Sequence, residues 1–154
     1  MIYGIASLYA NPLHSGHIDY LEGAKAQCDH LIVIVNNDKQ VDLKGSKVFM
    51  DEEHRARIVR ALKPVDEAYI SFDSDGSVAD TIAMIVKLIK EERRNGLFCS
   101  FFRKDTFAFF NSGDRNPQTY NKREEEVCNK LGIETVFLPM EKKYSSSLLK
   151  EPNN

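Results

Sequence analysis

Cysteine is scarce in this sequence, and long apolar runs are absent. The 154 residues include three cysteines, Cys28, Cys99 and Cys128, with no Cys-x-x-Cys spacing. An odd and unpaired set argues against a disulfide framework or a structural zinc site and favours a reducing compartment. No stretch approaches the roughly 20 apolar residues that a transmembrane helix needs. Residues 1–7 lack the basic and long apolar regions of a signal peptide, so we expect a cytoplasmic protein without a membrane span.

An excess of charge of one sign is also lacking. Lys and Arg number 21 and Asp and Glu number 23, for a formal net charge of −2. Such a chain is not suited to bind a nucleic-acid duplex by counterion release, so we expect no nucleic-acid partner. The composition is 42% hydrophobic and 29% charged, which excludes a disordered chain. Internal repeats, low-complexity stretches and linkers are absent, which predicts a single domain over residues 1–150 and a frayed tail over 151–154.

Short apolar runs alternate with segments of helical periodicity. The runs predict strands over residues 2–8, 31–35, 67–72, 107–110 and 133–138. The run at 31–35 is continuous and β-branched, as in a strand buried on both faces of a parallel sheet. The periodic segments predict helices over 17–27, from 51 to 64, from 77 onward and over 123–131, with a last short helix beginning at 145–147. This alternation predicts a Rossmann-like three-layer α/β/α fold with a parallel sheet of about five strands.

Local signals set the expected helix ends. We expect Asp51 and Ser77 to cap their helices and Gly132 to end the helix over 123–131. In the second helix, we expect an apolar face that ends near Pro64 and is formed by Ile58, Val59, Leu62 and Val65.

Two histidines follow the first predicted strand, in His14-Ser15-Gly16-His17. In a doubly wound sheet, ligands bind beyond the carboxyl ends of the strands, so this position is one to examine for chemistry. Both imidazoles lie on one side of a helix start, where free N–H groups favour an anion, and Gly16 lets the backbone approach a phosphate. A pair of surface or capping histidines is the structural alternative. A zinc site would need a third ligand, and none has suitable spacing.

Several motifs, in this order, resemble the cytidylyltransferase-like nucleotidyltransferase family, whose small enzymes carry a His-x-Gly-His sequence. The similarity extends over nearly the whole chain and includes segments 14–17, 35–38, 43–45, 51–55, 65–67, 111–115 and 144–147. The resemblance implies transfer of a nucleoside monophosphate from a nucleoside triphosphate to a phosphorylated small molecule, with release of pyrophosphate.

The resemblance also implies roles for individual residues. His14 and His17 would donate N–H groups to phosphate oxygens, and Lys44 would neutralise phosphate charge. The implied nucleotide- and phosphate-binding residues are Tyr9, Ala10, Asn11, Gly16, Arg55, Gly113, Asp114, Arg115, Ser145, Ser146 and Ser147. A Mg²⁺ ion that bridges the phosphates is expected, held mostly by substrate and water.

The chain departs from the family pattern at two places. Residues 8–11 read Leu, Tyr, Ala and Asn, so the loop before the histidines lacks the usual glycine and aromatic residue. Met140 stands where many members carry an arginine ahead of the serines. Segments 36–38 and 43–45 look closest to the branch that handles polyol, alcohol or sugar phosphates, with CTP as the first choice of donor and ATP as the second.

Four alternatives are weighed against a cytidylyltransferase. An adenylyltransferase of the same fold would use ATP, and a non-catalytic regulator would bind nucleotide only. Class I aminoacyl-tRNA synthetases share similar motifs, but this chain has no room for an anticodon-binding region. A pure interaction module would need none of these polar residues at strand ends.

We also expect a homodimer, as is common in the family. Phe98, Phe101 and Phe102 have no obvious internal partner in so small a domain. A lid over the site is the alternative role for this segment.

Overall fold

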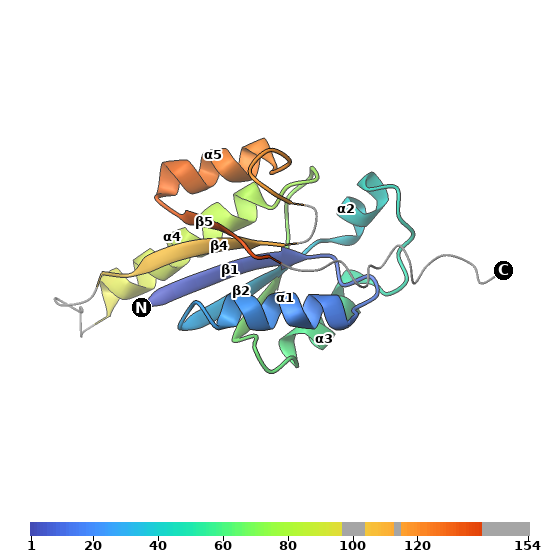
Figure 1. Cartoon of the computed structure of the whole chain (residues 1–154), viewed down its shortest axis with the longest axis horizontal. Coiled ribbons are helices and arrows are strands. Elements are labelled where there is room, and N and C mark those ends of the chain that lie inside the picture. Colours follow the sequence, from blue (N-terminus) through green and yellow to red (C-terminus); the bar gives the residue numbers. More distant parts are fainter. Residues whose placement is uncertain (97–103, 113–114, 140–154) are drawn as a thin grey trace.

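The computed structural model describes residues 1–96, 104–112 and 115–139 of the chain. Within them, five parallel strands form one sheet in the order β3-β2-β1-β4-β5. The strands are β1 (Ile2–Leu8), β2 (His30–Val35), β3 (Glu67–Ile70), β4 (Thr106–Asn111) and β5 (Glu134–Phe137). The helices are α1 (Ser15–Lys25), α2 (Asp38–Leu43), α3 (Glu52–Arg60), α4 (Ala79–Asn95) and α5 (Lys122–Leu131). Helices cover both faces of the sheet, which confirms the predicted three-layer Rossmann-like fold (Figure 1).

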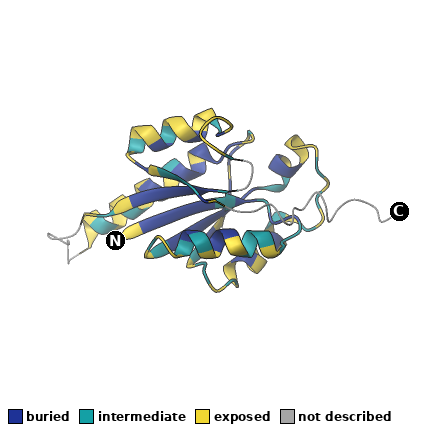
Figure 2. Cartoon of the chain, viewed as in Figure 1, coloured by how far each residue is buried: buried dark blue, intermediate teal, exposed yellow. Residues whose placement is uncertain are grey.

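Alternating side chains of the strands build two separate cores. Ala6, Leu8 and Val33 face the helices α1 and α3, where they pack with buried residues such as Leu21 and Val59. Their neighbours along the strands face α4 and α5 and form the second core with Tyr3, Ile5, Ile32, Ile34, Ile82, Phe107, Phe109 and Cys128. The central strands are therefore buried on both faces, as the continuous run at 31–35 predicts (Figure 2).

The strand order places a topological switch point between β1 and β4. The chain proceeds outward from β1 to β2 and β3, then crosses to β4 on the other side of β1. The loops that follow β1 and β4 therefore diverge at the carboxyl edge of the sheet, where such folds bind ligands. His14 lies in the first of these loops, and Asn111 ends the strand before the second.

Several element boundaries differ from the sequence predictions. Helix α1 begins at Ser15, two residues early, because His14 caps it. Strands β3 and β5 are shorter than the apolar runs that predict them. The six-residue helix α2 was not predicted, since it is too short to show a periodic apolar face.

Two expected details of the helices are wrong. Val78 rather than Ser77 is the N-cap of α4, and Asp73 satisfies the helix start by accepting hydrogen bonds from the N–H groups of Asp80 (2.8 Å) and Thr81 (3.1 Å). Helix α3 ends at Arg60 and not near Pro64, and Ile58 is exposed, whereas Val59 is buried and Leu62 and Val65 pack against the core as expected.

Other expected details are confirmed. Asp51 caps α3, and Gly132 ends α5 in the left-handed conformation (φ +69°). No described helix is long and apolar enough to cross a membrane. The helix predicted at 145–147 and the tail at 151–154 lie outside the described residues.

Arg55 ties together three segments at the carboxyl edge of the sheet. Its side chain is fully buried, and its Nη1 donates hydrogen bonds to the carbonyl oxygens of Tyr9 (2.7 Å) and Asn36 (2.6 Å). Nε donates to the carbonyl of Met50 (2.9 Å), and Nη2 pairs with the carboxylate of Asp38 (2.6 Å). One guanidinium group thus joins the ends of β1 and β2 to the segment before α3.

We predict that Arg55→Met lowers the free energy of unfolding by about 3 kcal/mol, because it leaves three carbonyls and a carboxylate without their donor. Arg55→Lys should recover part of the loss, since an ammonium keeps the charge but not the planar fork. Urea unfolding at pH 7 measures both, and Arg57→Met on the exposed side of the same helix is the matched control. A loss no larger than that of the control would contradict the role of this side chain.

Candidate functional site

The two histidines cap helix α1 reciprocally. The Gly16 N–H donates to Nδ1 of His14 (3.1 Å), and the His14 N–H donates to Nδ1 of His17 (3.2 Å). Each Nδ1 is therefore an acceptor, so in the neutral ring the hydrogen resides on Nε2. The capping contacts thus fix the tautomer of both imidazoles and turn each Nε2 into a donor.

The environment keeps both imidazoles neutral. The rings are stacked, with centroids 3.8 Å apart and planes inclined by 25°. Burial lowers the pKa of His14, and burial together with the neighbouring His14 and Lys44 lowers the pKa of His17 to about 3. The pair therefore offers two neutral N–H donors at pH 7, beside the start of a helix that favours an anion.

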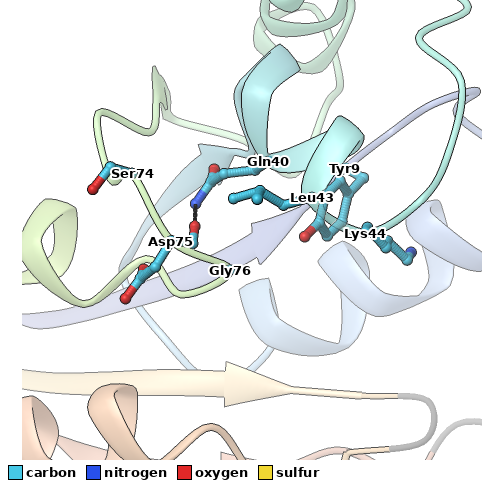
Figure 3. Close-up of a pocket in the computed structure, with 7 residues that line it drawn as sticks. All are labelled: Tyr9, Gln40, Leu43, Lys44, Ser74, Asp75 and Gly76. Atoms are coloured by element: carbon cyan, nitrogen blue, oxygen red, sulfur yellow. Dashed lines mark hydrogen bonds between the residues drawn. The ribbon is translucent and has the colours of Figure 1, made fainter.

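Lys44 and Tyr9 lie beside the histidines. Lys44 is the C-cap of α2, and its Nζ lies 4.4 Å from the centre of the Tyr9 ring. Both residues line a cavity of about 500 Å³ together with Gln40, Leu43 and segment 74–76 (Figure 3). The structure thus brings three predicted site residues, His17, Lys44 and Tyr9, to one place.

Arg115 supplies positive charge from the β4 side of the switch point. Its Nη1 donates to Oδ1 of Asn111 (3.3 Å) and pairs with the buried carboxylate of Glu124 (3.2 Å). Burial raises the pKa of Glu124, while Arg115 opposes that rise. The charge of Arg115 also opposes the rise that burial causes in the pKa of the Tyr9 hydroxyl.

Other predicted site residues lie behind the surface of the site. Asn11 is buried, donates to the Lys47 carbonyl (2.8 Å) and accepts from the Phe49 N–H (2.9 Å). Ala10 is buried with a positive φ of 49°. Arg55 directs four of its five N–H groups at the protein. The structure gives Asn11 and Arg55 positions that hold the loop, and a direct contact of either with phosphate stays a prediction.

Some predictions lie outside the described residues. These are the roles of Gly113, Asp114, Ser145, Ser146 and Ser147, the substitution at Met140, and the dimer or lid formed by Phe98, Phe101 and Phe102.

The sequence reasoning missed Gln40, Leu43 and segment 74–76 as parts of the site. Gln40 follows Asn37 by three residues, and this spacing is the available sequence signal, because Asn-x-x-Gln matches a capping box. It was overlooked because no periodic helix was expected there.

The described residues contain no group of three or more His, Cys, Asp or Glu side chains that could hold a metal ion. What the site offers instead is a set of N–H donors and cations at the switch point. Neutral imidazoles, an ammonium and a guanidinium suit a ligand rich in phosphate oxygens.

Comparisons with known proteins agree with this chemistry. The family model described as cytidylyltransferase-like matches residues 9–151. An FAD synthase of Picrophilus torridus is 44% identical over 131 residues, which are 84% of this chain and 77% of that protein. An FAD synthase of Ferroglobus placidus is 49% identical over 63 residues, a match that spans only 41% of either chain.

A solved structure shares the fold of this chain. A lipopolysaccharide core biosynthesis protein from Thermoplasma volcanium superimposes with a TM-score of 0.63 at 25% sequence identity. The match covers 92% of this chain and 99% of that one, so the similarity extends over the whole sheet.

We predict that His17 makes stability depend on pH. Its pKa is about 3 in the folded chain and 6.5 when unfolded, so the unfolded state binds more protons between these values. The contribution of His17 to stability is therefore complete above pH 6.5 and is lost progressively as the pH falls. Lowering the pH from 7 to 5 should cost the native protein up to about 2 kcal/mol more than it costs His17→Gln. Urea titrations of both proteins at the two pH values measure this, and parallel pH profiles would contradict it.

Proposed function

Because this chain belongs to the cytidylyltransferase-like family, as the match over residues 9–151 shows, we propose that it transfers the adenylyl group of ATP to a phosphorylated small molecule. The predictions of this family, of the fold and of the nucleotidyltransferase class are confirmed. The first choices of CTP and of a polyol, alcohol or sugar phosphate are not supported by the relatives, whose name, FAD synthase, favours the ATP alternative.

The observation that carries the proposal is the fixed, neutral histidine pair at the switch point. An oxygen of the acceptor phosphate forms a bond to the α-phosphorus as the bond from that phosphorus to the bridging oxygen of the β-phosphate breaks. Pyrophosphate leaves with the electron pair. Negative charge on the α-phosphate oxygens is then stabilised by the Nε2–H groups of His14 and His17 and by the ammonium of Lys44.

Neutral imidazoles suit this chemistry, because the transfer requires no proton to be removed from a phosphate acceptor that is already ionised. Two protonated rings 3.8 Å apart would repel each other, whereas two neutral rings donate without that cost. The same residues thus bind and orient the phosphates without forming a covalent intermediate.

We propose that Mg²⁺ enters with the nucleotide as part of the substrate. Within the described residues, no cluster of acidic and histidine side chains forms a resident metal site. Coordination by phosphate oxygens and water is the mode that such an ion prefers. A homodimer stays a prediction.

The acceptor to test first is flavin mononucleotide, because of the name of the relatives. The experiment measures pyrophosphate release from ATP and CTP, each with flavin mononucleotide, glycerol 3-phosphate, phosphocholine and a hexose phosphate. We expect release with ATP and flavin mononucleotide. Release with CTP alone would overturn the choice of donor, and nucleotide binding without release from any pair would instead support the non-catalytic regulator.

We predict that His14→Asn and His17→Gln each lower kcat by about a hundredfold or more, since a lost donor to developing negative charge costs about 2.7–4 kcal/mol. Asn is a good N-cap and Gln completes a capping box, so both variants should keep the start of α1. Circular dichroism and urea unfolding check the fold, and His54→Gln, an exposed histidine of α3, is the matched control with unchanged activity. An increase in KM with kcat unchanged would show that the imidazoles bind the ground state only.

A further inference from the structure

The cavity beside Lys44 is formed between helix α2 and the loop that joins β3 to α4. Figure 3 shows Gln40, Leu43 and Lys44 of α2 and its C-cap on one side, with Tyr9 beside them, and residues 74–76 on the other. The cavity holds about 500 Å³, within the range of small-molecule sites. Lys44 lies over the Tyr9 ring and also lowers the pKa of His17, so its charge is felt both at the cavity and at the histidine pair.

Two side-chain amides hold the far wall of this cavity. The Nδ2 of Asn37 donates to the carbonyls of Ser71 (2.9 Å) and Asp73 (3.0 Å). The Nε2 of Gln40 donates to the carbonyls of Asp75 (2.8 Å) and Ser77 (2.7 Å). Four alternate carbonyls of the loop are therefore fixed from one helix, and we name this set of contacts the amide clamp. The clamp sets the distance between the two walls.

Two polar side chains that line the cavity, Gln40 and Asp75, are already paired within the protein. The Oε1 of Gln40 accepts from Nδ2 of Asn36 (3.1 Å) and from the Asn37 N–H (3.0 Å), so its amide group uses its full hydrogen-bonding capacity. The Asp75 carboxylate accepts from Ser77 and pairs with Arg123, and these contacts lower its pKa to about 2. A ligand rich in hydroxyl groups would lose water here without gaining these partners.

The apolar lining, in contrast, remains available to a ligand. Leu43 is 58% exposed although it lies at the cavity, and Tyr9 is half-buried with its ring at the cavity wall. A flat aromatic surface gains free energy by covering both side chains, and an aromatic pair adds to that gain.

We propose that this cavity binds the non-phosphate part of the acceptor, that this part is a planar heteroaromatic ring system, and that Tyr9 and Leu43 determine this specificity. The inference rests on the proposed function, because it takes the acceptor phosphate to lie at Lys44 and the histidines. The ring then extends from there between α2 and segment 74–76, in contact with Tyr9 and Leu43.

The test uses the full chain and the fluorescence of flavins, which a stacked tyrosine quenches. Riboflavin and flavin mononucleotide are titrated against the native protein, Tyr9→Phe, Tyr9→Leu and Leu43→Ser without nucleotide. KM is then measured for flavin mononucleotide and for ATP, with glycerol 3-phosphate as the flexible polyol acceptor. Leu88→Ser is the matched control, since Leu88 is a similarly exposed leucine on α4 that does not line the cavity.

We expect Tyr9→Leu and Leu43→Ser each to raise the flavin Kd and the KM for flavin mononucleotide about fivefold to tenfold, with the KM for ATP unchanged. Tyr9→Phe keeps the ring and should retain the native flavin Kd, and Leu88→Ser should resemble the native protein. Leu43 is exposed, so its variant keeps the test decisive if Tyr9→Leu does not fold.

The outcomes separate the two proposals. Transfer to flavin mononucleotide with flavin binding unchanged in Tyr9→Leu and Leu43→Ser overturns this inference and leaves the proposed function intact. Riboflavin binding that these variants weaken, with no adenylyl transfer, supports the cavity and overturns the function. A better kcat/KM for glycerol 3-phosphate than for flavin mononucleotide overturns the ring specificity.

Discussion

The carboxyl edge of the sheet depends on one buried guanidinium group. Where β1 and β2 end, their carbonyl groups leave the ladder and need donors, and burial makes an unsatisfied carbonyl costly. Arg55 supplies donors to the carbonyls of Tyr9 and Asn36, and it places its charge against Asp38 at the start of α2. The Tyr9 ring, the amide clamp and Lys44 at the end of α2 all take their positions from segments that this group joins.

A second constraint is that the histidines of the site are also structural. His14 and His17 complete the start of α1, and the hydrogen bonds that do so fix which ring nitrogen carries hydrogen. The free N–H groups at a helix start attract anions. Here some N–H groups at the start of α1 instead bond to the two imidazoles, and these bonds orient the Nε2–H groups as two further donors. As a result, the half-buried imidazole of His17 resists protonation. Residues 14–17 therefore stabilise the start of α1 and also present the N–H donors of the site.

Much of the fold was predictable, because its signals are local and repeated. The continuous run at 31–35, the capping residue Asp51 and the stop at Gly132 each depend on sequence neighbours, and each is confirmed. Helix α2 was missed because six residues show no period, and the cap of α4 was assigned to Ser77 because Asp73 acts from outside the helix.

The site was predictable to the extent that it follows strand ends. The sequence reasoning could place His14, His17, Lys44 and Arg115 at the carboxyl edge of the sheet, because parallel strands end at one edge. The cavity was not predictable, because its far wall comes from a loop whose position is set by side chains of α2, a contact between residues more than 30 positions apart. From the sequence, the positive charge of Arg55 suggests that it binds a phosphate group. The fold shows that its partners in the protein are three carbonyl groups and a carboxylate.

The amide clamp has a consequence for how this protein can change over evolutionary time. It holds the loop through backbone carbonyls, so the course of the loop depends on Asn37 and Gln40 and not on the side chain at position 74 or 76. A Cβ atom at Gly76 would meet no described atom within 4 Å. Positions 74 and 76 are therefore sites where mutation can reshape one wall of the cavity while the scaffold stays intact.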